Sequence, residues 1–294
     1  MSDLNLIPMP ATIKNLPGDF DTQLISSIIL KNNSKKEKNC AKLFQSYLRP
    51  IGDISISSTK ESQENQLIIE LDRSSHIEVE GYSLLIGKED AIYLNGSSAS
   101  GLFYGFQTFI QMCDRSLESG IKPEKTVVPN CEIKDSPGFA YRGMHLDVPI
   151  HFFDVAFVKT YIDMIAFHKM NVFHWHLTDN EAWRVELDCY PNLTKVGAFR
   201  GYDYTIPPFY GTGYNKTGGY YSHNQINELI VYAKQRNIEI MPEIDLPAHS
   251  WTLLQVMPEL RDSSSNIISE DVGNYTNNTI NPALEETNIF LQNI

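Results

Sequence analysis

The chain has 294 residues, of which 42% are hydrophobic and 20% charged, and its formal net charge is −12. This length fits one large domain or two ordinary ones, and the composition is typical of a globular protein. The acidic balance argues against a nucleic-acid partner, because phosphate binding needs concentrated Lys and Arg.

The N-terminal segment M-S-D-L-N-L-I-P-M-P has neither the charged start nor the apolar run of a signal peptide. The sequence also has no run of about 18 apolar residues, so we expect no membrane span and a cytoplasmic location. The cysteines have no CxxC and no metal-ligand spacing, which is typical of free thiols in an intracellular protein; they are Cys40, Cys113, Cys131 and Cys189. The basic run from Lys31 to Lys38 is mixed with Asn and Ser, and it predicts a solvated loop.

Residues 1–130 are predicted to form a small α+β domain that is structural in role, since no residues there have the types or spacing of a catalytic site. Apolar periodicity predicts its helices and strands. They are a helix over 41–49, a strand over 66–72, a hairpin of 82–86 with 91–94, and a helix over 99–113 that Ser98 would cap. Residues 116–135 would link this domain to the next.

From Phe139 the pattern changes to strands that alternate with helices. Strands are predicted over 141–148, 172–177 and 238–244. Asp154 would cap a first helix that runs to about Met170, and Ser222 with Gln225 would form the capping box of a second. The intervening loop, 179–221, is long enough to be functional. A last helix would begin at Asn281-Pro282.

This alternation indicates βαβ units, a parallel sheet and a (β/α)₈ barrel. Polar residues recur where the strands end, on the face that carries the active site in barrel enzymes; they are Asp147, Asp179, Glu243, Asp245 and His249. A complete barrel needs about 250 residues, more than the chain offers after Phe139. We therefore expect residues 138–294 to be the first part of a catalytic barrel that is truncated, and so incomplete, in this chain.

Three groups of residues are candidates for chemistry, each with a structural alternative. His174 and His176 point to one face of a strand and could share a metal ion, or could fill the barrel interior. Asp179 and His249 could form an acid–base orienting pair. Asp147 and Glu243 could act in a site, or could serve as a turn former and as a buried, hydrogen-bonded carboxylate.

Many aromatic residues lie in or beside the long loop. Aromatic faces can stack on the C–H faces of sugar rings, although ordinary loop packing would also account for them. These residues are Trp175, Trp183, Tyr202, Tyr204, Phe209, Tyr210, Tyr214, Tyr220 and Tyr221.

The order of several motifs resembles the β-N-acetylhexosaminidases of glycoside hydrolase family 20. The matching runs are Y-R-G-M-H-L-D (141–147), N-V-F-H-W-H-L-T-D (171–179), W-R-V-E-L-D-C-Y-P-N-L-T (183–194), V-G-A-F-R-G (196–201), G-G-Y-Y-S (218–222) and M-P-E-I-D-L-P-A-H-S (241–250). G-L-F-Y-G-F-Q-T (101–108) is similar to part of the small domain that precedes the barrel in this family. The resemblance thus covers nearly the whole chain.

The resemblance implies release of terminal N-acetylhexosamine from glycans or chitooligosaccharides. The substrate's own acetamido oxygen would attack the anomeric carbon, while a Glu acts as acid and then base and a neighbouring Asp orients the acetamido group; the family is an exception to the two-carboxylate scheme. Asp179 and His249 would relay to that Glu. We further expect Trp183, Asp147 and Glu243 to contact the substrate, and no metal or organic cofactor.

The sequence departs from the family pattern at its catalytic centre. The Asp-Glu pair, in a run like H-x-G-G-D-E, does not occur in these 294 residues. Ile150 occupies the position of an Arg that grips the sugar, and Ile cannot donate hydrogen bonds. Asn180 and Ala248 replace a common Asp and Gly, which are milder changes.

We therefore expect the chain to be inactive alone, with a C-terminal portion or partner chain missing. Two alternatives are a non-catalytic homologue that binds amino sugars and a metal-dependent barrel hydrolase that uses His174 and His176.

Overall fold

A computed structural model describes residues 4–58, 64–72, 78–113, 126–261 and 275–294. The chain divides into two compact units. The first contains the residues up to Arg142 together with Asp163–Asn171 and Lys234–Ile238, and the second contains Gly143–Ile162, Val172–Ala233 and Glu239–Ile294. None of the helices in the described ranges is long and apolar enough to span a membrane.

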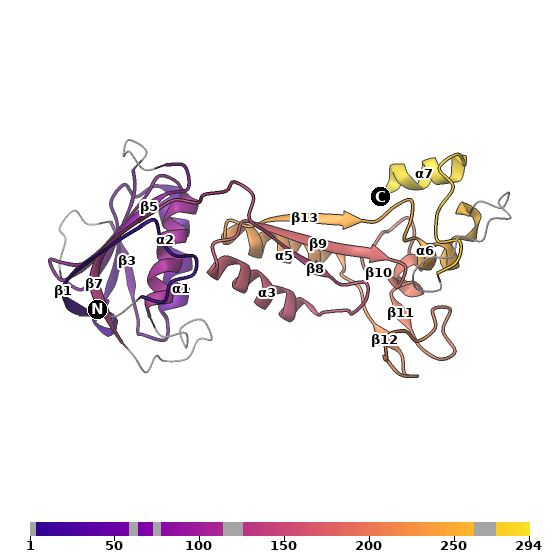
Figure 1. Ribbon diagram of the computed structural model, residues 1–294, viewed down its shortest axis with the longest axis horizontal. Helices are drawn as coiled ribbons and strands as arrows, with labels where there is room; N and C mark the ends of the chain where they lie inside the picture. The colour runs from indigo at the N-terminus through magenta and orange to yellow at the C-terminus, as the bar shows by residue number, and fades with distance from the viewer. Residues whose placement is uncertain (1–3, 59–63, 73–77, 114–125, 262–274) are drawn as a thin grey trace. The chain divides into compact units, whose positions relative to one another are not determined.

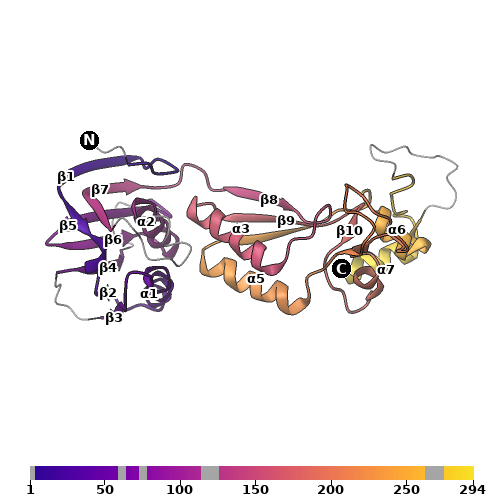
Figure 2. The ribbon, with the colours of Figure 1, turned by 90° about the horizontal axis from the view of Figure 1, so that it is seen from below.

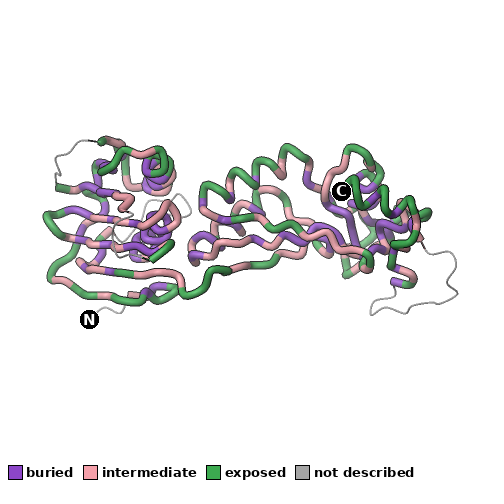
Figure 3. Tube along the Cα trace, turned by 90° about the horizontal axis from the view of Figure 1, so that it is seen from above, coloured by how far each residue is buried: buried purple, intermediate pink, exposed green. Residues whose placement is uncertain are grey.

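The first unit is built on a seven-stranded sheet with the order β1-β7-β5-β6-β4-β2-β3. Its strands are β1 (Thr12–Asp21), β2 (Ser27–Leu30), β3 (Ser55–Ser57), β4 (Gln66–Leu71), β5 (Tyr82–Lys88), β6 (Ala91–Gly96) and β7 (Val127–Asp135). A 3₁₀ turn, η1 (Thr22–Leu24), follows β1. Helices α1 (Lys35–Leu48) and α2 (Ala99–Met112) lie together on one face of the sheet (Figure 1). Most of α2 is buried, as its purple tube shows (Figure 3).

Two sequence interpretations in this unit are wrong. The basic run from Lys31 to Lys38 is not a loop throughout, because α1 begins at Lys35. The Ser34 hydroxyl accepts from the Glu37 backbone N–H while the Glu37 side chain accepts from the Ser34 N–H, a capping box that starts the helix before its apolar stripe. The predicted link over 116–135 ends in strand β7, which pairs with both β1 and β5, and its residues 116–125 lie outside the described ranges.

The second unit is a parallel sheet that alternates with helices. β8 (Gly143–Asp147), α3 (Val155–Phe167), β9 (Val172–Asp179), α5 (His223–Gln235) and β13 (Glu239–Ile244) follow in order, and β9 pairs in parallel with both β8 and β13. Helices α3 and α5 lie on the same face of this sheet (Figures 1 and 2). This is the opening part of a (β/α)₈ barrel, and the barrel does not close within the described residues.

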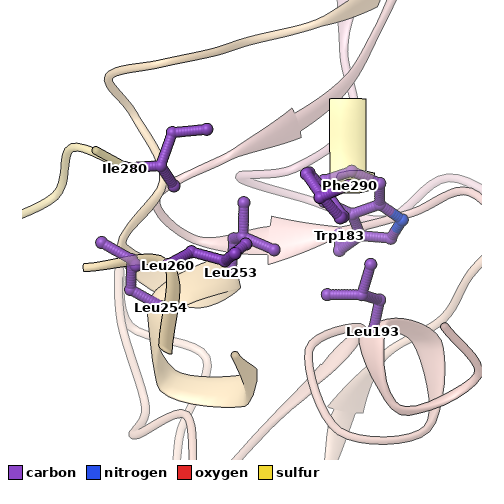
Figure 4. Close-up of a cluster of buried hydrophobic side chains, with 7 residues drawn as sticks. All are labelled: Trp183, Leu193, Leu253, Leu254, Leu260, Ile280 and Phe290. Carbon is purple, nitrogen blue, oxygen red and sulfur yellow. The ribbon is translucent and has the colours of Figure 1, made fainter. Parts of the chain in front are cut away.

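Shorter elements form the side of the second unit where the parallel strands end. They are β10 (Ala182–Trp183), α4 (Asn192–Lys195), β11 (Phe199–Arg200), β12 (Thr217–Gly218), α6 (Trp251–Val256), η3 (Pro258–Leu260) and α7 (Glu285–Asn293). Apolar side chains from β10, α4, α6, η3 and α7 meet in one buried cluster around Trp183 (Figure 4). The predicted last helix begins at Glu285 rather than at Asn281, because the Asn281 side chain accepts from the Ala283 N–H and forms a turn before the helix.

Candidate active site

The polar residues predicted at the strand ends lie at one edge of the parallel sheet. Asp147 is aligned with His176 across β8 and β9, and Glu243 is aligned with the same His176 across β9 and β13. Asp179 ends β9, and Asp245 follows β13 directly. Because parallel strands end at the same edge, residues far apart in sequence come together there.

Asp179 and His249 form a hydrogen-bonded pair, as the sequence predicted. The His249 Nδ1 atom lies 2.8 Å from Asp179 Oδ1. A carboxylate can only accept, so the proton is on Nδ1, and this hydrogen bond orients the imidazole ring. His249 has a φ of 53°, in the left-handed region that residues other than glycine rarely adopt. Such backbone strain is typical of functional positions.

Asn180 explains why the His249 loop lies against the end of β9. Its side-chain oxygen accepts from the Trp251 N–H at 3.2 Å and from the Asn278 amide at 3.3 Å. Its backbone oxygen accepts from the Thr252 hydroxyl at 2.6 Å. Asn180 is 3% exposed, so these bonds are made away from solvent and fix the start of α6 to β9. The sequence showed only that Asn180 replaces a common Asp.

Asp245 is a member of the same cluster that sequence reasoning noted at a strand end without giving it a role. One of its carboxylate oxygens lies 4.0 Å from His249 Nδ1, and its N–H donates to the Thr178 hydroxyl at 3.0 Å. Burial raises the pKa of the Asp245 carboxyl, and the positive character of His249 partly opposes that rise. Two carboxyl groups, those of Asp179 and Asp245, therefore face one imidazole.

Glu181 is a buried carboxyl group that the sequence did not reveal. The residue is 5% exposed, and its Oε1 accepts from the Tyr210 hydroxyl at 3.1 Å. Burial raises the pKa of Glu181 and the nearby Asp179 carboxylate raises it further, while hydrogen bonds from Tyr275 and Tyr210 lower it. Arg200, which is buried and donates to the Ile150 backbone oxygen, attracts the same carboxylate. The sequence signal that could have indicated a role for Glu181 in this site is its position two residues after Asp179.

The loop after β8 is held by a buried guanidinium. Arg184 is 1% exposed and donates to the backbone oxygens of Val148 at 3.0 Å, Pro149 at 2.8 Å and Gly219 at 3.0 Å, and also to that of Ala198. Burial lowers the pKa of Arg184 to about 9, with a further contribution from the neighbouring Arg200. The position of Ile150, at the end of this loop, is thereby fixed by two arginines.

Asp147 and Glu243 lie near the relay pair but make other contacts. The Asp147 side chain accepts from the Ile150 N–H at 3.3 Å, so part of its role is the turn former that the sequence offered as an alternative. Glu243 Oε2 lies 2.6 Å from His174 Nε2, and both side chains are about one third exposed.

Trp183 is a core residue in this structure. It is 2% exposed, its indole N–H donates to the Val185 backbone oxygen at 2.7 Å, and its ring packs against Leu193 and Phe290 (Figure 4). Trp175 and Tyr221 are also buried, 4.5 Å apart between ring centroids. The loop aromatics that face solvent are Tyr202, Tyr204, Tyr210 and Tyr214.

Among the residues that the structure describes, two groups of side chains have distances compatible with a metal ion. One consists of His145, His176 and Glu243, and the other of His176, Asp179 and Asp245. The predicted pair of His174 and His176 is therefore divided, because His174 contacts Glu243 instead of completing either group.

Comparison with known proteins identifies the family. Residues 139–294 match the family model described as "Glycosyl hydrolase family 20, catalytic domain", and residues 3–136 match domain 2 of the same family. The chain belongs to glycosyl hydrolase family 20.

Relatives in family 20 are considerably longer than this chain. A beta-hexosaminidase of Vibrio furnissii is 33% identical over 98% of this chain, which spans 45% of that protein. One from Porphyromonas gingivalis is 36% identical over 87% of the chain and 32% of its own length. The chain thus spans less than half of these relatives.

Solved structures of family 20 have the same fold. An exo β-N-acetylglucosaminidase of Vibrio harveyi, solved in complex with N-acetylglucosamine, superimposes with a TM-score of 0.85 at 33% identity. The match covers 98% of this chain and 43% of that one. A β-N-acetylhexosaminidase from Bacteroides fragilis gives 0.78 at 27% identity, with 98% and 53% covered.

Proposed function

We propose that this chain is the N-terminal portion of an exo-β-N-acetylhexosaminidase that releases terminal N-acetylhexosamine from glycans or chitooligosaccharides. The observation that carries the proposal is the Asp179–His249 pair at the edge of the sheet where the parallel strands end. Support comes from membership in family 20 and from similarity to an enzyme solved with N-acetylglucosamine.

In this proposal Asp179 and His249 position a catalytic carboxyl group without touching the substrate. Asp179 holds the proton of His249 on Nδ1 and so orients the imidazole, whose Nε2 would contact a glutamic acid. That glutamic acid would lie in a Gly-Asp-Glu run, which these 294 residues do not contain. It would protonate the leaving oxygen while the substrate's acetamido oxygen attacks the anomeric carbon, and would then activate water.

The three residues predicted to contact substrate receive different roles in this proposal. Asp147 and Glu243 carry carboxylates that are partly exposed near the relay pair and can accept hydrogen bonds from sugar hydroxyls. Trp183 instead supports the segment that carries Asp179, because both faces of its ring are buried. Stacking on the sugar would then fall to exposed loop aromatics such as Tyr210.

Ile150 weakens the expected hold on the sugar. An arginine at this position would offer paired hydrogen bonds, whereas Ile offers none. Loss of a charged hydrogen bond in a site typically costs about 1.5–3 kcal/mol. The loop itself is fixed by Arg184 and Arg200, so we expect this loss to be local.

The proposal predicts that the purified 294-residue chain does not hydrolyse an aryl N-acetyl-β-glucosaminide above the buffer rate. The reason is that a relay pair without its carboxylic acid cannot protonate the leaving group. Hydrolysis that disappears in an Asp179→Asn variant would show that the acid lies within these residues and would overturn this division of roles.

A further inference from the structure

Helices α3 and α5 lie on one face of the β8–β9–β13 sheet (Figures 1 and 2). The strand register places three histidines and one glutamate on the other face. His145 is aligned with His174, and Glu243 is aligned with His176, while alternate residues such as Phe173 point to the helices. Alternation along strands therefore places these four side chains together.

The distances within this group suit metal ligation. The ligand atoms of His145, His176 and Glu243 all lie within 4.8 Å of one another, and His145 Nε2 is 3.8 Å from Glu243 Oε2. Zinc binds nitrogen and oxygen at about 2.0–2.2 Å in tetrahedral sites, which places neighbouring ligand atoms roughly 3.4 Å apart. The side chains of His145 and Glu243 are 48% and 35% exposed, so a small rotation of each could close the difference.

His176 supplies an independent observation that points to a ligand. The residue is 7% exposed, and its Nε2 is buried without a hydrogen-bond partner among the residues that the structure describes. The Asp179 carboxylate, at 3.8 Å from Nε2, is too far for a hydrogen bond. A buried ring nitrogen without a partner is unfavourable, and a metal ion would satisfy it.

We propose that His145, His176 and Glu243 bind one Zn²⁺ ion. Two imidazoles and a carboxylate are a donor set that suits zinc and not the oxygen-binding ions Ca²⁺ and Mg²⁺. His174, 2.6 Å from Glu243 Oε2, orients the carboxylate as a hydrogen-bonding neighbour of a metal ligand does. The fourth position would be open to water or a small ligand.

The group of His176, Asp179 and Asp245 competes for the same imidazole. Both groups need His176, so one ion excludes the other. The first group is favoured because it offers two nitrogen donors, and because one oxygen of Asp179 already accepts from His249. The proposed zinc site shares Glu243 with the proposed sugar contacts but uses neither Asp179 nor His249. Zinc binding can therefore be tested separately from the relay pair that carries the proposed glycosidase function.

The test is titration of the chelator-treated 294-residue chain with ZnCl₂ by calorimetry, in a Cys189→Ser background because that cysteine is exposed. We expect one equivalent of Zn²⁺, with affinity reduced at least about tenfold in His145→Ala and in Glu243→Gln. His223→Ala, at an exposed histidine on α5, should bind as the parent does. Co²⁺ in place of Zn²⁺ should give the visible absorption of a tetrahedral site.

Absence of stoichiometric Zn²⁺ binding by the folded parent chain would overturn the proposal. So would binding that is unchanged in both His145→Ala and Glu243→Gln, or that is lost in Asp245→Asn alone. His145 and Glu243 are partly exposed, so their variants should fold, and circular dichroism would check this. The test does not use His176→Ala, because His176 is buried and its truncation would leave a cavity that destabilises the fold.

Discussion

The Asp179–His249 pair lies at the boundary between solvent and interior, which limits how much it stabilises the fold. The Asp179 side chain is 15% exposed, and that of His249 is 47% exposed. Water screens such a pair on one side and weakens its contribution to stability. We therefore infer that the main effect of the pair is to orient the His249 imidazole. The strained backbone at His249 supports the same view.

A double-mutant cycle would measure the interaction within this pair. Asp179→Asn and His249→Ala, alone and together, should give a coupling free energy of about 0.5–1 kcal/mol, because a half-exposed hydrogen bond to a carboxylate is worth about that much. Urea denaturation followed by circular dichroism provides the free energies of unfolding. Strictly additive effects would mean that the 2.8 Å contact does not form in solution.

Glu181 should make stability depend on pH. Its pKa is raised by burial and by Asp179, so the folded state favours the protonated carboxyl. The stability that this group contributes is therefore present at low pH and is lost as the pH rises through the folded-state pKa. Glu181→Gln keeps an acceptor for Tyr210 but cannot ionise.

The Glu181→Gln variant should consequently gain stability relative to the parent as the pH rises from about 4 to about 7. Denaturation midpoints at both pH values give the difference. Glu259→Gln, at an exposed carboxyl group, is the matched control. If the stability difference between Glu181→Gln and the parent stayed constant across this pH range, the raised pKa of Glu181 would be contradicted.

At the scale of single elements, the capping box of α1 is unusually buried. Glu37 is fully buried and accepts from the N–H groups of Ser34 and Leu71, both at 2.9 Å. It thus ties the start of the helix to the end of strand β4. Loss of the carboxylate would leave these donors without a partner.

Glu37→Ala should lower the free energy of unfolding by about 2–4 kcal/mol, since charged hydrogen bonds are lost and buried donors stay unpaired. Lys38→Ala, at an exposed position one residue later in the same helix, should change it by less than about 0.5 kcal/mol. Chemical denaturation distinguishes the two. If Glu37→Ala and Lys38→Ala changed the free energy of unfolding equally, the capping box would not be formed in solution.

Elements with local signals could be predicted from the sequence. The Ser222–Gln225 box and the Asp154 cap involve residues three apart, and both caps are present. β7 was missed because its place in the sheet depends on pairing with β1, over a hundred residues away. The burial of Glu181, Asn180 and Trp183 likewise depends on α6, α7 and the loop aromatics, which no local pattern brings together.

At the scale of the whole molecule, the parallel sheet is covered unequally. Helices α3 and α5 cover one face, while the other carries His145, His174 and Glu243 with substantial exposure in the part of the chain that is described. The sequence predicted the barrel class from strand–helix alternation, and its incompleteness from the number of residues that follow Phe139. It could not predict which interior side chains would meet, because that depends on strand register.

In the proposed function, this chain supplies the relay pair, Asp179 and His249, of a hexosaminidase site. A chimera tests it, in which the chain is continued by the part of the Vibrio harveyi enzyme that lies beyond the matched region. The measurement is the initial rate of aryl N-acetyl-β-glucosaminide hydrolysis, with Asp188→Asn, at a 93% exposed side chain, as the control.

We expect the chimera to hydrolyse the substrate, with a kcat at least about tenfold lower in Asp179→Asn and unchanged in Asp188→Asn. A folded chimera that does not hydrolyse the substrate, or that is unaffected by Asp179→Asn, would contradict it.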